Sequence, residues 1–142
     1  MSKDNRPKVG MGVYVVKDGK FLMGERKGSN GANTWCLPGG HLEYSESWEE
    51  CAERETLEET GVEIENVRFL GLTNDIFEEG KHYITIFVIA DYSSGEPEVC
   101  EPDKFLGWKW VDLSTLPERL FLPVENLLRS EFLEDLNREL RK

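Results

Sequence analysis

Hydrophobic residues gather along the chain in short stretches rich in β-branched and aromatic side chains, a pattern typical of strands. The expected strands cover residues 9–17, 20–24, 67–72, 82–91 and 105–111. Asp18-Gly19 joins the first two as a favoured two-residue hairpin turn. Glu79-Gly80 supplies a turn before residues 82–91. The pattern predicts a sheet built largely from neighbouring stretches of chain.

Two other stretches carry the signals of helices. Ser47 followed by Glu50 has the capping-box spacing, so a helix is expected to begin there and to stop at Gly61. Pro123 at a first helical position predicts a second helix over residues 124–141. Its apolar face would consist of Leu127, Leu128, Phe132 (or Leu133) and Leu136. The order of strands, helix, strands and helix predicts a mixed sheet between helices, an α/β fold of the α+β type.

A glycine-rich loop at residues 28–33 precedes a short apolar run at residues 35–37, which ends at Pro38-Gly39-Gly40. No repeat or linker divides the 142 residues, so one domain over residues 1–142 is expected.

Composition is typical of a globular protein, with 39% hydrophobic and 32% charged residues. No stretch approaches the ~20 apolar residues of a membrane span, and the N-terminus lacks the apolar region of a secretory signal. Three cysteines without CxxC spacing argue against a disulfide framework or a zinc site. These features predict a cytoplasmic protein without a membrane partner.

The net charge of −11 is concentrated in one segment, because residues 43–65 hold ten glutamates and one arginine. Such a field repels a nucleic-acid backbone, and the basic patch of a nucleic-acid binder is missing, so no nucleic-acid polymer is expected as a partner. A small phosphorylated molecule remains compatible if divalent cations lie between it and the carboxylates. The alternative is a solvated acidic helix.

The position of two glutamates on the first helix favours a metal site. At about 100° per residue, Glu55 and Glu59 lie about 20° on either side of Trp48, in the middle of the expected apolar face. The other members of that face are Cys51, Ala52 and Val62. Paired carboxylates there are costly unless they are compensated, and Mg²⁺, with Mn²⁺ as a substitute, prefers such oxygen ligands. Basic residues from elsewhere in the chain would be the alternative partners.

Residues 40–62, GHLEYSESWEECAERETLEETGV, resemble the Nudix box, a glycine and a glutamate followed by Arg-Glu-apolar-x-Glu-Glu-x-Gly-apolar. The matching positions are Gly40, Glu46, Arg54, Glu55, Glu58, Glu59, Gly61 and Val62. Thr56 departs from the pattern, because an aliphatic residue is usual there. The resemblance implies a Nudix-like α/β/α sandwich that hydrolyses a diphosphate linkage in a nucleotide.

Within this superfamily the chain is similar to nucleoside-triphosphate diphosphatases of the MutT homologue 2 type. The similarity rests on residues 37–59, 82–87, 96–104 and 120–121. It implies hydrolysis of nucleoside triphosphates, modified or oxidised purines among them, to the monophosphate and pyrophosphate, and it implies a homodimer. Two alternatives are hydrolysis of another nucleoside diphosphate derivative, such as a nucleotide sugar, and a catalytically silent ligand-sensing domain.

The resemblance also implies roles for individual residues. Glu55 and Glu59 would be the main Mg²⁺ ligands, helped by Glu58 and the Gly39 carbonyl. Glu101 is the candidate for a further ligand or base, although it could equally be a solvated loop residue beside Glu96, Glu98 and Asp103.

The remaining box residues would orient the ligands. Arg54 acts in the catalytic set as a fixed fork for carboxylates, with Glu46 as its partner, and Gly40 permits a tight approach of the backbone. Substrate would contact Arg26 at the phosphates, and Thr85, Phe121 and Leu122 at the base. Phe121 could instead belong to the core. Lys27, next to Arg26, could be either a phosphate contact or an exposed charge.

Overall fold

The computed structural model describes residues 5–28 and 31–142, and in this part of the chain seven strands form one sheet. The strands are β1 (Lys8–Lys17), β2 (Lys20–Arg26), β3 (Trp35–Cys36), β4 (Gly39–His41), β5 (Glu63–Ile76), β6 (His82–Ser94) and β7 (Phe105–Val111). The helices are α1 (Trp48–Thr60), α2 (Leu122–Leu128) and α3 (Leu133–Leu140). Short 3₁₀ helices cover Glu78–Gly80 and Leu113–Thr115.

The sheet is mixed, as expected. Strand order is β3-β2-β1-β6-β5, with β4 paired to β1 and β7 paired to β2. Only the β1–β6 pair is parallel among these described strands, and the other pairs are antiparallel. The β1–β2 hairpin turns at Asp18 and Gly19, both at positive φ (52° and 78°), which confirms the predicted turn.

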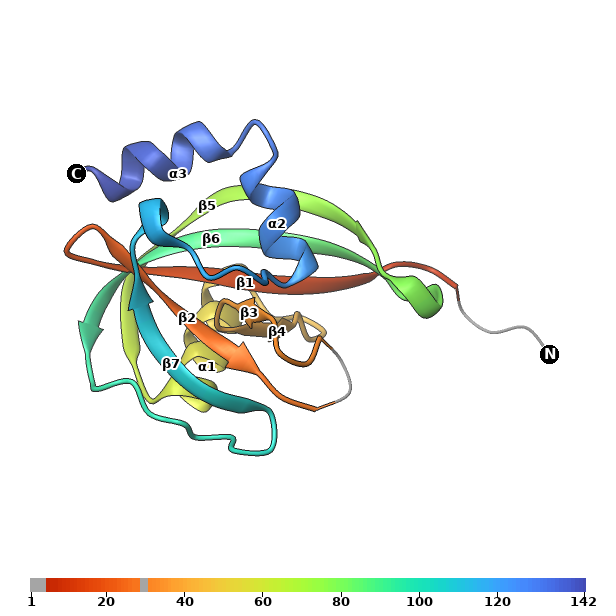
Figure 1. Cartoon of the computed structure of the whole chain (residues 1–142), viewed down its shortest axis with the longest axis horizontal. Coiled ribbons are helices and arrows are strands. Elements are labelled where there is room, and N and C mark those ends of the chain that lie inside the picture. The colour runs from red at the N-terminus through yellow and green to blue at the C-terminus, as the bar shows by residue number, and fades with distance from the viewer. Residues whose placement is uncertain (1–4, 29–30) are drawn as a thin grey trace.

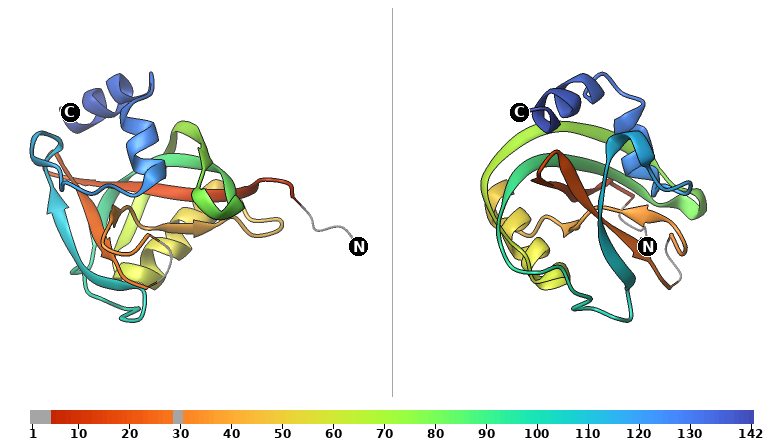
Figure 2. Two further views of the ribbon diagram at one scale, coloured as in Figure 1. Left: turned by 45° about the vertical axis from the view of Figure 1, so that its right-hand side comes forward. Right: turned by 60° about the vertical axis from the view of Figure 1, so that its left-hand side comes forward.

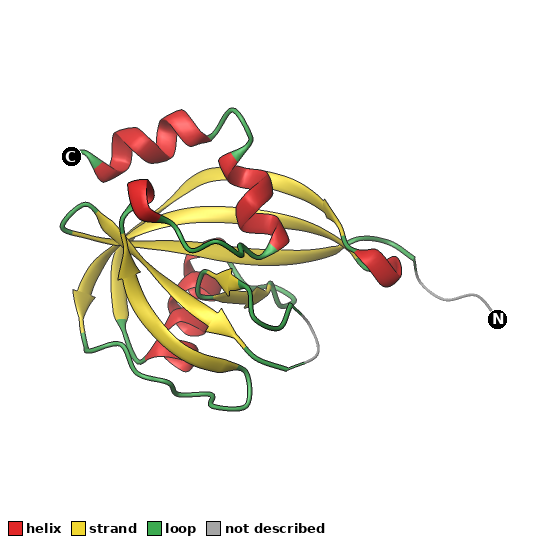
Figure 3. Ribbon diagram, viewed as in Figure 1, coloured by secondary structure: helices red, strands yellow, loops and turns green. Residues whose placement is uncertain are grey.

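Helices cover both faces of the sheet, with α1 on one face and α2 and α3 on the other (Figures 1 and 2). Figure 3 shows the same three-layer arrangement by element type. One core packs α1 against β1, β5 and β6 through Cys51, Ala52, Val13, Val62 and Val88. The second core packs α2 and α3 against the opposite face through Tyr14, Phe87, Leu127 and Leu136. The predicted α+β sandwich is confirmed.

The single C-terminal helix predicted over residues 124–141 is wrong. Two helices are separated near Ser130, whose hydroxyl accepts from the Phe132 N–H and donates to the Leu127 carbonyl. The Phe132 ring lies so close to Gly71 of β5 that a Cβ there would overlap it. Docking of this ring onto the sheet therefore sets the break, which the helical spacing of the apolar residues could not reveal.

Other boundaries also differ from those expected. β5 is 14 residues long instead of six. Its pairing with β6 shifts register at three places, so hydrophobic and polar residues do not alternate regularly along its whole length. Gly39 and Gly40, expected to end an apolar run, form β4 instead. The turn expected at Glu79-Gly80 is a 3₁₀ helix. None of the helices in the described residues is long and apolar enough to cross a membrane.

Candidate active site

The acidic helix α1 begins and ends as its caps predict. Ser47 Oγ accepts from the Glu50 N–H (3.1 Å), and the Glu50 carboxylate accepts from the Ser47 N–H (2.9 Å). Gly61 adopts φ 77° and closes the helix through a hydrogen bond to the Leu57 carbonyl. These local contacts place the box glutamates on a rigid helix beneath the sheet.

The buried face of α1 is rotated from the one predicted around Trp48. Trp48 is 41% exposed and packs at a tilt against the Phe69 ring (5.3 Å between ring centroids), so its assignment to the core is wrong. Thr56 and Thr60 are instead fully buried, and the Thr60 hydroxyl donates to the Thr56 carbonyl. Thr56, which departs from the Nudix pattern, is therefore a core residue. Its hydroxyl has no hydrogen-bond partner among the described residues.

Two carboxylates of α1 meet the glycine strand β4. Glu59 is 6% exposed, and its Oε1 accepts the Gly39 N–H at 3.0 Å. The Glu55 carboxylate lies directly over Gly40, where any Cβ would overlap it. A side chain at position 40 would therefore displace the Glu55 carboxylate, while a Cβ at Gly39 would overlap the Met11 backbone carbonyl, and both glutamates face the same short strand.

The electrostatic environment disfavours charge on both carboxylates. Burial raises the pKa of Glu59 to about 8, and the nearby Glu55 and Glu101 carboxylates add to this rise. Burial likewise raises the pKa of Glu55, with Glu58 and Glu101 contributing. Shared negative charge in a half-buried site is the condition under which a bound cation is most stabilising.

Arg54 holds the outer side of this cluster. Its guanidinium binds Glu46 through two hydrogen bonds, Nε to Oε2 (2.6 Å) and Nη2 to Oε1 (3.0 Å), and it reaches Glu55 and Glu58 at 3.3 Å. The hydrogen bonds from Arg54 lower the pKa of Glu46 to about 2. Glu46 is therefore the main partner of Arg54, while Glu55 and Glu58 each make a longer contact with the same guanidinium.

Glu101 approaches the same cluster from the loop before β7. The loop lies along the end of α1, since the Cys100 N–H donates to the Glu59 carbonyl (3.4 Å). Glu101 is half-buried, whereas the competing Glu96, Glu98 and Asp103 are exposed. Its negative charge contributes to the raised pKa of Glu55 and Glu59, and its own carboxylate lies 3.8 Å from Lys104 Nζ.

The carboxylate oxygens of this cluster are suitable ligands for a hard divalent cation. In the described ranges, no three acidic, histidine or cysteine side chains are already arranged around one point as a metal centre. Glu55 and Glu59 nevertheless combine oxygen donors, partial burial and mutual repulsion beside a strand of glycines, which suits Mg²⁺ or Mn²⁺. Glu58 is more exposed and bound to Arg54, so it lies at the margin.

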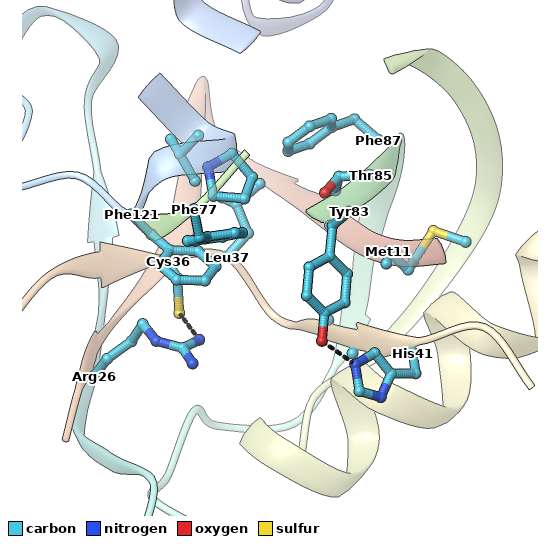
Figure 4. Close-up of a pocket in the computed structure, with 16 residues that line it drawn as sticks. Met11, Arg26, Cys36, Leu37, His41, Phe77, Tyr83, Thr85, Phe87 and Phe121 are labelled. Atoms are coloured by element: carbon cyan, nitrogen blue, oxygen red, sulfur yellow. Dashed lines mark hydrogen bonds between the residues drawn. The ribbon is translucent and has the colours of Figure 1, made fainter. Parts of the chain in front are cut away.

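A cavity of about 150 Å³ opens on the other side of β4 (Figure 4). Gly39 and Gly40 line it, so the same short strand borders the cavity and contacts the carboxylates. Its aromatic walls include Phe77, which packs against Tyr83 (5.9 Å between ring centroids) and Phe121 (5.6 Å).

Several predicted substrate residues meet in this cavity. Arg26, Thr85 and Phe121 line it, and the Arg26 guanidinium lies 4.1 Å from the centre of the Phe121 ring. Leu122 is not among the lining residues, and the following Pro123 and Val124 take that place.

Sequence reasoning missed several members of the cavity wall. His41, Phe77 and Tyr83 were not predicted to act there, although His41 accepts or donates a 3.0 Å hydrogen bond with Tyr83 inside it. The alternation along β6, which places Tyr83, Thr85 and Phe87 on one face, was the signal that could have found Tyr83. Phe77 follows β5 and had no such signal.

The structure places Lys27, which the sequence left open, and buries Cys51 as expected. Lys27 Nζ donates to the Pro102 carbonyl (3.0 Å), so it ties the glycine-rich loop to the loop that carries Glu101. Ser29 and Asn30 of that glycine-rich loop lie outside the described residues. Cys51 is fully buried, and burial raises the pKa of its thiol to about 12, which excludes a ready thiolate nucleophile.

Comparison with known proteins agrees with this geometry. The NUDIX domain model matches residues 6–135. The chain is 31% identical over 106 residues to an oxidized purine nucleoside triphosphate hydrolase of Danio rerio, covering 74% of this chain and 66% of that protein. It is 32% identical over 116 residues to an ADP-ribose pyrophosphatase of Methanocaldococcus jannaschii, covering 81% and 68%.

Other relatives are longer than this chain. A NAD-capped RNA hydrolase of Vibrio atlanticus is 28% identical over 132 residues, which cover 92% of this chain and 45% of that protein. Among solved structures, a MutT NUDIX hydrolase from Burkholderia pseudomallei superposes with a TM-score of 0.79 at 34% identity, covering 86% of this chain and 98% of that one.

The family match over most of the chain, together with the capped acidic helix against its glycine strand, shows that this protein belongs to the Nudix hydrolases, pyrophosphohydrolases of nucleotide derivatives.

Proposed function

We propose that the protein hydrolyses nucleoside triphosphates, modified or oxidised purine nucleotides among them, to the nucleoside monophosphate and pyrophosphate. The observation that carries this proposal is the shared strand β4, whose Gly39 and Gly40 contact the carboxylates and also line the aromatic cavity. A base in the cavity would place its phosphate chain across the glycines, toward Glu55 and Glu59. The oxidized purine nucleoside triphosphate hydrolase of Danio rerio supports this choice.

Each residue has a defined task in the proposed reaction. Glu55 and Glu59, with Glu58 and the Gly39 carbonyl, would hold Mg²⁺, which supplies positive charge against the phosphates and lowers the pKa of bound water. A carboxylate, with Glu101 as the candidate, accepts the proton of the attacking water. The new bond joins water oxygen to phosphorus, and the anhydride P–O bond breaks to release pyrophosphate. Arg54 and Glu46 keep the ligands oriented, and Arg26 neutralises charge at the cavity mouth.

Two other properties belong to this proposal. We expect the protein to act in the cytoplasm as a homodimer, and to bind small nucleotides in preference to nucleic-acid polymers or membranes. The net charge of −11 supports the exclusion of polymers, because it opposes binding of a phosphate backbone.

The test is kcat/KM, from pyrophosphate or phosphate release with Mg²⁺, for canonical, methylated and oxidised nucleoside triphosphates. ADP-ribose, a nucleotide sugar and a dinucleoside tetraphosphate serve as competitors. The best triphosphate should exceed each competitor by at least about tenfold, or about 1.4 kcal/mol in transition-state binding. A competitor that wins by this factor would overturn the substrate assignment and leave the family unchanged.

ADP-ribose is the second candidate substrate, because the relative from Methanocaldococcus jannaschii is an ADP-ribose pyrophosphatase. A silent ligand-sensing domain would bind nucleotides without turnover on any member of the panel. The presence of Glu55, Glu58 and Glu59 argues against that reading.

A further inference from the structure

A buried carboxylate beside the cavity has no part in the proposed reaction. Asp75 of β5 is fully buried and accepts three hydrogen bonds, from Thr73 Oγ1 (3.0 Å), Thr85 Oγ1 (2.5 Å) and Asn126 Nδ2 (2.8 Å). Burial of a carboxylate is unfavourable unless hydrogen-bond donors compensate it. The network joins β5, β6 and α2 at the back of the cavity, and a residue this costly calls for a specific role.

The network fixes the direction of one hydroxyl group. Thr85 lines the cavity, and its single hydroxyl proton is used in the hydrogen bond to Asp75. A carboxylate can only accept, so Thr85 cannot reverse this bond. The lone pairs that remain on Thr85 Oγ1 therefore act as acceptors, and a polar group that meets them must be a donor.

Space for such a group exists next to Thr85. Gly10 of β1 pairs with Thr85 across the parallel strands, and a Cβ on Gly10 would lie 3.6 Å from Thr85 Oγ1. The absence of a side chain at Gly10 leaves this volume to the cavity, which Gly10 also lines. Tyr83 and Phe87 flank Thr85 along β6 and offer aromatic surface on either side (Figure 4).

We propose that Asp75 is a specificity-determining, positioning residue, which holds Thr85 as an obligate hydrogen-bond acceptor so that the cavity selects bases presenting an N–H donor. This inference rests on the proposed function for the base pocket, and it names the chemistry by which the pocket selects its base. Asp75 acts through Thr85 and does not line the cavity itself. A purine edge with an amino group or a protonated ring nitrogen satisfies Thr85, whereas an edge carrying only acceptors leaves two acceptors facing each other.

The first measurement uses the wild-type protein and four purine nucleotides that differ in their donors. Purine riboside has no N–H on this edge, adenosine has an amino group, inosine has a ring N–H, and guanosine has both. We measure kcat/KM for the triphosphates with Mg²⁺, and Kd for the monophosphates by calorimetry with chelator. Purine riboside should be weaker than the best donor-bearing base by at least about tenfold in both measurements.

The second measurement compares Asp75→Asn with the matched control Asp91→Asn. An amide at position 75 can donate to the Thr85 hydroxyl, which frees that proton to point into the cavity. The discrimination against purine riboside should then shrink to within about threefold, while the Mg²⁺ concentration needed for half-maximal turnover stays unchanged. Asp91 lies on the same sheet in an ion pair with Arg68, outside the cavity lining, and its substitution should leave the discrimination intact.

Each outcome decides the proposal. Equal binding of all four monophosphates by the wild type overturns it, and so does an Asp75→Asn protein that weakens every nucleotide by the same factor. If Asp75→Asn fails to fold, Thr85→Val replaces it, and retained discrimination against purine riboside in that variant overturns the proposal. If monophosphates are discriminated but no triphosphate is hydrolysed, the proposed reaction fails and the inference about Asp75 stands.

Discussion

At the scale of single residues, the site holds carboxylates in a buried position where, without a bound cation, negative charge is unfavourable. Glu59 is nearly buried, accepts one backbone N–H from Gly39, and faces two other carboxylates. Arg54 relieves this repulsion only in part, because its shortest contacts go to Glu46 and it reaches Glu55 at 3.3 Å. A bound cation would compensate the unfavourable free energy of holding these carboxylates close together in a buried site. Two predictions rest on this compensation.

Glu59→Gln should lower kcat/KM by at least about a hundredfold while the protein remains folded. The substitution keeps the shape of the side chain but removes a negative charge that would bind Mg²⁺. The metal-free variant should be as stable as the wild type or slightly more stable, because the neutral glutamine enters the buried site without the proton uptake, or the buried charge, that Glu59 requires. Turnover with Mg²⁺ and denaturation with chelator measure the two effects, and undiminished turnover in Glu59→Gln would refute the metal assignment.

The stability of the metal-free protein should fall as pH rises between about 4.5 and 8. The pKa of Glu59 is raised from 4.5 to about 8 in the folded protein, so the folded state holds a proton that the unfolded state has lost within this window. Its contribution is complete below pH 4.5 and disappears as pH passes 8. The local slope approaches on the order of 1.4 kcal/mol per pH unit.

Urea denaturation with chelator at pH 5, 6, 7 and 8 measures this slope. In Glu59→Gln the slope should become flatter, since the titrating group has been removed. A free energy of unfolding that rises across this range, or an identical slope in both proteins, would contradict the assigned environment of Glu59.

At the scale of elements, the site is a helix pressed against a two-glycine strand. Gly40→Ala should lower kcat/KM by about tenfold or more, because the new methyl group overlaps the Glu55 carboxylate and moves it. The matched control is Gly107→Ala on β7, where nothing lies within 4 Å of the added Cβ. Turnover and thermal unfolding measure both variants, and an unchanged kcat/KM in Gly40→Ala would show that the position of Glu55 is unimportant.

At the scale of the whole molecule, an apolar strip remains uncovered on the outer face of β5. Phe69, Leu72 and Ile76 are 47%, 47% and 67% exposed, and the Trp48 ring packs against Phe69. Leu57 of α1 is also 50% exposed. Apolar area of this kind is typical of an interface between subunits.

We therefore expect a homodimer that uses this strip. Sedimentation should give about twice 16.4 kDa at micromolar concentration, and Leu72→Lys should shift the protein toward the monomer. Leu106→Lys, at a residue of β7 that is 54% exposed, is the control and should leave the mass unchanged. A 16.4 kDa species at high concentration in the unsubstituted protein would refute the dimer.

The sequence alone determined those features that depend on short-range contacts. The β1–β2 hairpin follows from Asp18-Gly19, and the ends of α1 follow from Ser47 and Gly61, because each signal acts within a few residues of itself. The pairing of Glu55 with Glu59 also follows from helical spacing. The Nudix-like sandwich and the family were predictable for the same reason, since the box is one continuous segment.

Only the tertiary structure decided which distant segments meet. The break between α2 and α3 depends on Phe132 reaching Gly71, and Trp48 lies partly exposed against Phe69 of β5 instead of in the core. The bond from Thr85 to Asp75 requires β5 and β6 to pair in one register. Periodicity reports which face a residue occupies relative to its neighbours, but it carries no information on which other element packs there. For that reason the box carboxylates could be found from the sequence, while the polarity of the cavity wall could not.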